Sequence, residues 1–66
     1  MRTRTYDVTI AFRSGGSEYG REKYTVEAVD RTTAGRAALV KAEDSGFDDP
    51  RIPDLSRRIV SCRLAA

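Results

Sequence analysis

The clearest structural signal in the chain is YDVTIAF, residues 6–12. Its large aromatic and aliphatic side chains occupy every second position, which is the period of a β-strand with one buried face. The segment KYTVEA, residues 23–28, repeats the alternation, and a turn-rich loop with three glycines, residues 14–20, separates the two. Two alternating runs joined by a short glycine-rich loop predict a β-hairpin whose apolar residues share one face.

A helix is predicted after the hairpin, over AGRAALVKAEDSGF, residues 34–47. Asp30, Thr32 and Thr33 are candidates for the N-cap, because their side chains can accept a hydrogen bond from the first-turn amides. The inward face of this helix consists mainly of alanine and glycine, so we expect the helix to lie close against the sheet. Gly46 stands where a C-terminal glycine cap is expected.

The rest of the chain predicts a connection over residues 48–56 and a third strand over residues 59–64. On that strand we expect the apolar side to carry Val60, Cys62 and Leu64. Strand, strand, helix and strand over residues 1–66 predict one α+β domain. A right-handed crossover favours a three-stranded antiparallel sheet in the order 3-1-2, with the helix on one face. Pairing of the third strand with the second is the alternative.

The composition limits the chemistry that the domain can carry out. The 66 residues include one cysteine and no histidine, which excludes an internal disulfide framework and removes the commonest catalytic base and metal ligand. No apolar run approaches the ~18 residues of a membrane helix, and the first ten residues contain no apolar core of signal-peptide length. We therefore expect a cytoplasmic, non-enzymatic domain without a metal, a cofactor or a membrane contact, in which Cys62 is structural.

Charge is distributed unevenly along the chain. Residues 1–42 carry eight basic and five acidic groups, residues 43–54 five acids and one arginine, and residues 55–66 three arginines. In the predicted fold, one end of the domain collects the arginine pole, defined as Arg2, Arg4, Arg31, Arg36 and Arg63. The opposite end holds a candidate acidic contact surface, Glu43, Asp44, Asp48 and Asp49. The arginine pole is a candidate site for a phosphate backbone or an acidic protein surface; an arginine-rich composition without a binding role is the alternative.

The sheet face turned away from the helix is the third candidate surface. We expect it to show, among others, Thr9, Thr25, Glu27, Ile59 and Ser61. It lacks the exposed aromatic side chains on which RNA bases stack, because the aromatic residues of both hairpin strands point inward. An open three-stranded sheet more often meets another protein, or a second copy through an edge strand. The chain is therefore predicted to bind a protein; nucleic-acid binding at the arginine pole and a self-associating homodimer are the alternatives.

Three segments together form a recognisable pattern: the alternating Tyr24-Thr-Val-Glu-Ala28, the capped helix with Ala34, Ala38 and Ala42, and Arg58-Ile-Val-Ser. This pattern resembles small β-β-α-β proteins of bacteriophages and mobile elements. Some of these, certain anti-CRISPR proteins among them, act by docking on a host protein. The same plan is similar to small ribosomal domains of archaea and eukaryotes that bind RNA. The resemblance implies a small binding protein, an inhibitor or adaptor, and carries over no functional residue.

The terminal Leu64-Ala65-Ala66 is similar to the end of the bacterial transfer-messenger-RNA degradation tag, so a degradation signal is a further hypothesis.

Overall fold

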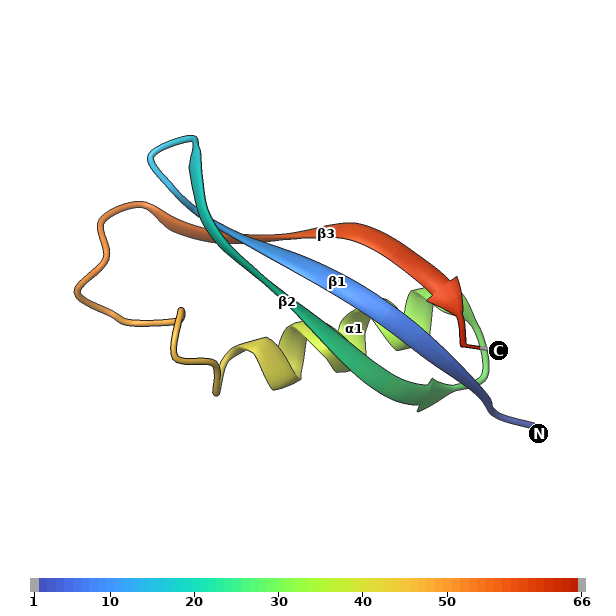
Figure 1. The fold of residues 1–66 in the computed structure, drawn as a ribbon. Coiled ribbons are helices and arrows are strands. Elements are labelled where there is room, and N and C mark those ends of the chain that lie inside the picture. The colour runs from blue at the N-terminus through green and yellow to red at the C-terminus, as the bar shows by residue number, and fades with distance from the viewer. Residues whose placement is uncertain (1, 66) are drawn as a thin grey trace.

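The computed structural model describes residues 2–65 and contains three strands and one helix in the predicted order (Figure 1). The elements are β1 (Arg4–Ser14), β2 (Ser17–Ala28), α1 (Arg31–Ala42) and β3 (Leu55–Leu64). The sheet order is β2-β1-β3, and both strand pairs are antiparallel. The predicted α+β fold and its strand order are thus confirmed, and pairing of the third strand with the second is excluded.

The hairpin between β1 and β2 is tighter than predicted. Gly15 and Gly16 form its turn with φ values of 56° and 89°, a backbone that glycine adopts without steric cost. Strand pairing begins at Ser14 opposite Ser17, so residues 17–20 belong to β2 rather than to a loop. A register shift leaves Tyr19 as an extra residue on β2, because Phe12 pairs with Gly20 and Arg13 with Glu18.

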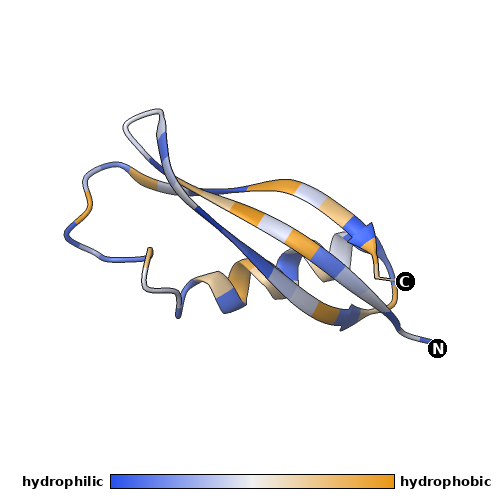
Figure 2. Ribbon diagram, in the orientation of Figure 1, coloured by the Kyte–Doolittle hydropathy of each residue, from blue (hydrophilic) through white to orange (hydrophobic). Residues whose placement is uncertain are grey.

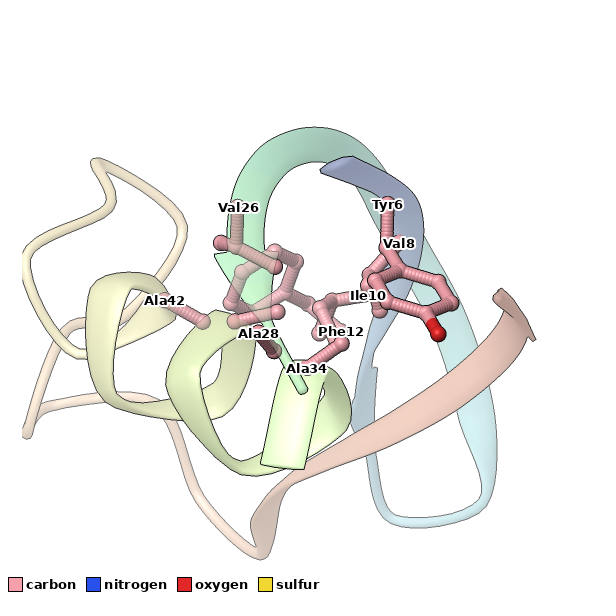
Figure 3. Packing of buried hydrophobic residues seen from close by; sticks show 9 residues of the cluster. Tyr6, Val8, Ile10, Phe12, Val26, Ala28, Ala34 and Ala42 are labelled. Carbon is pink, nitrogen blue, oxygen red and sulfur yellow. The ribbon is translucent and has the colours of Figure 1, made fainter. Parts of the chain in front are cut away.

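The hydrophobic core lies between the sheet and α1 (Figure 3). The alternating residues of β1 supply its large side chains, which are buried: Tyr6, Val8, Ile10 and Phe12. The helix contributes small side chains, also buried: Ala34, Ala38 and Ala42. Because these carry no atom beyond Cβ, α1 approaches the sheet closely, as the sequence predicts.

The helix begins and ends earlier than predicted. Asp30 has an extended backbone and accepts a hydrogen bond from the Thr33 amide at 2.8 Å, so it is the N-cap. The helix ends at Ala42, with Glu43 as C-cap, and the prediction of a glycine cap at Gly46 was wrong. The Ser45 hydroxyl donates to Glu22 of β2 at 2.8 Å, which ties the chain to the sheet and takes it off the helical path.

The molecule is elongated, 40 × 16 × 16 Å, because its strands are longer than its helix. Twelve residues of helix span about 18 Å, whereas twelve residues of strand span about 40 Å. The connection between α1 and β3 covers the rest of the inner face. Its Phe47 ring packs on Phe12 with 5.3 Å between ring centroids, and Tyr19 donates a hydrogen bond to the Phe47 carbonyl at 2.6 Å.

Strand β3 departs from regular alternation at Val60. Thr9 of β1 pairs with Ser61 and Ile10 with Ile59, so Val60 is the extra residue of a β-bulge. A bulge reverses which face the side chains take on its two sides. Ile59 therefore lies on the helix side, with its Cδ1 2.8 Å from the position that a Cβ on Gly35 would occupy. The prediction that Ile59 lies on the open face was wrong.

Val60 is the second residue that the bulge displaces. It was predicted to point inward with Cys62 and Leu64. Instead it borders a hollow of about 200 Å³ on the open face, beside Ala11 and Arg58. The final segment Leu64-Ala65-Ala66 continues the strand only in part: Leu64 ends β3 and the Ala65 amide donates to the Thr5 carbonyl at 2.9 Å, whereas Ala66 lies outside the described residues.

Candidate functional site

The arginine pole is only partly assembled. Arg2, Arg4 and Arg31 line one open hollow of about 750 Å³ at the start of α1. Arg36 is exposed on the helix, close enough to Asp30 to act on its carboxylate. Arg63 lies away from the hollow, on the open face of the sheet, opposite Asp7. Three of the five predicted arginines thus surround a common space, and the other two do not.

Asp30 also lines this hollow and is held in its charged form. The hydrogen bond from the Thr33 amide is the main cause that keeps the pKa of Asp30 below its ordinary value, and the nearby Arg36 guanidinium acts in the same direction. The carboxylate also faces the positive end of the helix dipole, which favours a negative charge there. Because Asp30 occupies the helix N-terminus, an anion in the hollow would meet the arginine side chains rather than the first-turn amides.

The predicted acidic contact surface is divided between internal ion pairs and exposed side chains. Asp48 accepts a hydrogen bond from Arg57 of β3, and Asp49 pairs with Arg51 at 3.0 Å. The first contact ties the connection to β3, and the second lies within the connection. Glu43 and Asp44 are exposed after the last turn of α1 and form no ion pair within residues 2–65. Only these two acids remain available for a partner.

The open sheet face is polar. It carries Thr9, Thr25, Glu27 and Ser61, as the alternation with buried neighbours predicts. Thr25 donates a hydrogen bond to Asp7 across the β1–β2 pair at 2.8 Å. A shallow hollow of about 260 Å³ on this face is lined by Asp7, Thr9, Lys23, Ser61, Arg63, Leu64 and Ala65. Away from Val60, the face offers hydrogen-bonding groups and single charges. Ile59, which was predicted on this face, lies on the helix side.

Strand β3 is an edge strand that exposes apolar side chains on both of its faces. Ile59, Val60 and Leu64 are 39%, 43% and 48% exposed. Figure 2 shows hydrophobic colour in the middle of β3, along the border of the sheet. Within the described sheet, β3 has a strand partner on its β1 side alone. We call the outer side of residues 58–64, with its backbone groups and exposed side chains, the β3 edge.

The other edge of the sheet has the opposite character. Strand β2 presents charged side chains along its exposed positions: Glu18, Arg21, Lys23 and Glu27. Charged residues of both signs on an edge strand discourage the addition of a further strand. The two edges of one small sheet therefore differ: β2 presents charges of both signs, whereas β3 presents exposed apolar side chains and arginines.

The charge of the β3 edge is positive. The strand has the sequence LSRRIVSCRL, with three arginines and no acidic residue. Arg57 is engaged by Asp48, whereas Arg58 and Arg63 form no ion pair in the described part of the chain. Both lie on the open face, opposite Ala11 and Asp7 of β1. The β3 edge thus combines unpaired backbone, apolar side chains and two guanidinium groups.

Cys62 packs against the core from β3, and its Sγ lies 4.0 Å from the Arg31 carbonyl. Across residues 2–65, no three His, Cys, Asp or Glu side chains are grouped so that they could hold a metal ion. The one helix among the same residues is too short to cross a membrane.

Comparison with known proteins returned no match to the chain, whether with family models, curated proteins or solved structures. A functional assignment therefore rests on the surfaces of the molecule.

Sequence reasoning missed the β3 edge because it assumed strict alternation over residues 59–64. The neighbouring pair Ile59-Val60, directly after Arg57-Arg58, was the available signal. A regular strand cannot direct two adjacent apolar residues to one face. Either a bulge or apolar exposure on both faces follows from such a pair, and the structure has both.

Proposed function

We propose that this chain is a small, cytoplasmic, non-enzymatic binding protein that docks on a protein partner through the β3 edge, as an inhibitor or adaptor. The observation that carries the proposal is the contrast between the two edges of the sheet. The β3 edge exposes Ile59, Val60 and Leu64, whereas the β2 edge is charged. An added strand on such an edge gains main-chain hydrogen bonds and side-chain contacts together.

The hydrogen bonds of two carboxylates, Glu22 and Asp49, agree with a binding role rather than a catalytic one. A catalytic base works best with a pKa near the operating pH. Hydrogen bonds from Tyr24 and Ser45 lower the pKa of Glu22, and those from Arg51 lower the pKa of Asp49. These carboxylates are weakened as bases and are committed to holding the fold.

Two features of the sequence agree with the same role. The resemblance to bacteriophage and mobile-element β-β-α-β proteins points to a protein that acts by docking on another. The chain has one cysteine, Cys62, which is a free thiol and suits the reducing cytoplasm.

Affinity capture with three baits tests the proposal: wild type, Val60→Glu and Val40→Glu. Val40 is 64% exposed on α1, so the same substitution there changes the net charge equally without touching β3. We expect a partner protein that wild type and Val40→Glu retain, and that Val60→Glu retains about tenfold less, equivalent to a loss of about 1.4 kcal/mol in binding. Equal recovery by all three folded baits, or recovery of nucleic acid in place of a protein, contradicts the proposal.

A second candidate function is nucleic-acid binding at the hollow of Arg2, Arg4 and Arg31, because three arginines around one space can contact neighbouring phosphates. Binding to duplex DNA would then weaken with salt, with a slope of about −0.9 per phosphate contact in a plot of log K against log salt concentration. The double variant Arg2→Glu, Arg4→Glu should flatten this slope, and Arg58→Glu on the β3 edge is the control. A flat salt response of the wild type rejects this function.

A further inference from the structure

We infer that the partner segment bound by the β3 edge is an extended acidic strand, with two carboxylates four positions apart and three apolar residues between them. This inference rests on the proposed function, because it names the chemistry of the partner at the same edge. Three features of β3 carry it: the spacing of its free arginines, the absence of acids in its sequence and its apolar side chains.

The spacing comes from the strand register. Arg58 pairs with Ala11 of β1 and Arg63 with Asp7, so four positions of a regular strand separate them. That distance is about 13 Å. The bulge at Val60 takes up the additional residue of β3. A strand added on the outer side in the register of β1 would therefore meet the two arginines at its positions i and i+4, with Val60 between them.

The charge of β3 selects an acidic partner over a second copy of the chain. Strand β3 contains no acidic residue, so pairing it with itself would bring the arginines of both copies together. Like charges on facing strands are destabilising, whereas opposite charges stabilise the pair. Within the described residues, neither arginine is paired with an acid. Asp7, which lies opposite Arg63, accepts a hydrogen bond from Thr25 instead, and the three ion pairs formed by residues 2–65 include neither Arg58 nor Arg63.

The apolar side chains define the residues between the two carboxylates. On the helix side, the residues of β3 between the two arginines are Ile59, which is 39% exposed and adjoins Gly35 of α1, and Cys62, which is half-buried. Leu64 is 48% exposed one position beyond Arg63. Alternate residues of an added strand would point to this side, since side chains of a strand alternate between faces. The pattern that fits is acidic, apolar, apolar, apolar, acidic, with both carboxylates on the open face.

The probe is the synthetic peptide acetyl-Ser-Glu-Ile-Val-Leu-Glu-Ser-amide, compared with versions in which Gln or Lys replaces both Glu. Binding to the full chain is followed by amide chemical shifts. We expect the acidic peptide to shift the β3 amides and to bind about tenfold more tightly than the Lys peptide, since two cross-strand pairs change from attraction to repulsion. Added salt should reduce the difference.

Matched variants of the chain complete the test. Arg58→Glu should abolish the preference, because one cross-strand pair then attracts and the other repels each of the two peptides. Arg36→Glu, the same charge change on α1, should leave the preference for the acidic peptide unaltered. Loss of the preference in Arg58→Glu alone supports the inference, and unchanged preference in both variants overturns it.

The remaining outcomes separate the inference from the proposed function. Equal binding of the three peptides at β3 overturns the acidic specificity and leaves the β3 edge as a docking site. Absence of peptide binding, together with a captured protein that Val60→Glu loses, overturns strand addition but not protein binding. Three further outcomes each overturn the inference. The first is a set of peptide shifts confined to the hollow of Arg2, Arg4 and Arg31, the second is displacement of the acidic peptide from β3 by DNA, and the third is concentration-dependent pairing of β3 with a second copy.

Discussion

Gly20 and Gly35 lie where α1 and the connection after it pack closely against the sheet. A Cβ on Gly20 would lie 2.6 Å from Cε1 of the Phe47 ring, and one on Gly35 would lie 2.8 Å from Cδ1 of Ile59. The two neighbours differ in how they can yield. The Phe47 ring is rigid and packs on Phe12, whereas Ile59 meets Gly35 with the end of a flexible, partly exposed side chain. The sequence predicted a loop at Gly20, which the structure places in β2, and the contact with Phe47, 27 residues away, was not predicted.

We expect Gly20→Ala to lower the free energy of unfolding by about 1–3 kcal/mol, because the added methyl group displaces the Phe47 ring from Phe12. Gly46→Ala is the matched control. No atom lies within 4 Å of its Cβ position, so we expect a change within about 0.5 kcal/mol. Urea denaturation measures both. Coinciding midpoints for the two variants would contradict the close packing of Phe47 against Gly20.

Among the elements, the two hairpin strands were predicted more accurately than the helix or β3. Period-two alternation is a local property, and it identified the inward residues of β1 and β2. The helix end depends on Ser45, whose hydrogen bond to Glu22 reaches another element. The bulge in β3 depends on which residue packs under α1, and Ile59 rather than Val60 takes that place.

The N-cap of α1 gives the molecule a testable dependence on pH. The pKa of Asp30 is lower in the folded chain than its ordinary value of 3.8. Its charged form therefore stabilises the fold above that value, and this contribution is lost as the pH falls through the lower folded pKa. Asp30→Asn keeps an oxygen acceptor for the Thr33 amide but does not titrate.

We therefore expect the denaturation midpoint of wild type to fall more steeply than that of Asp30→Asn as the pH is lowered from 5 to 2. The other carboxylates with lowered pKa, Glu18, Glu22 and Asp49, titrate in both proteins and cancel in the comparison. Parallel profiles for the two proteins would show that the charge of Asp30 does not stabilise the helix.

The whole molecule is a long two-layer domain in which a short helix and an anchored connection share one face of the sheet (Figure 1). The central strand β1 pairs on both sides and supplies most of the large buried side chains. The outer strands pair on one side, and β3 is the more exposed of the two. Stability is therefore expected to decrease from the centre of the sheet toward β3.

Amide hydrogen exchange should follow this order. We expect the β1 amides to exchange only through global unfolding, and the outward amides of β3 to exchange fastest within the sheet. Addition of the acidic peptide should slow exchange at β3 and leave the outward amides of β2 unchanged. Equal protection of both edges in the free chain would contradict an open β3 edge.

Residue order alone was sufficient to predict the α+β class, a favoured strand order, three candidates for the N-cap and the inward residues of β1, because periodicity, capping and crossover handedness act through near neighbours or general topology. The structure decided that β3 pairs with β1 and that Asp30 is the N-cap. The face of Ile59, the engagement of Asp48 by Arg57 and the opening of the β3 edge required the folded molecule. Each depends on contacts between segments that only the packed chain brings together. The same packing placed Arg58 and Arg63 together on the edge strand β3, whereas the sequence had assigned Arg63 to the arginine pole.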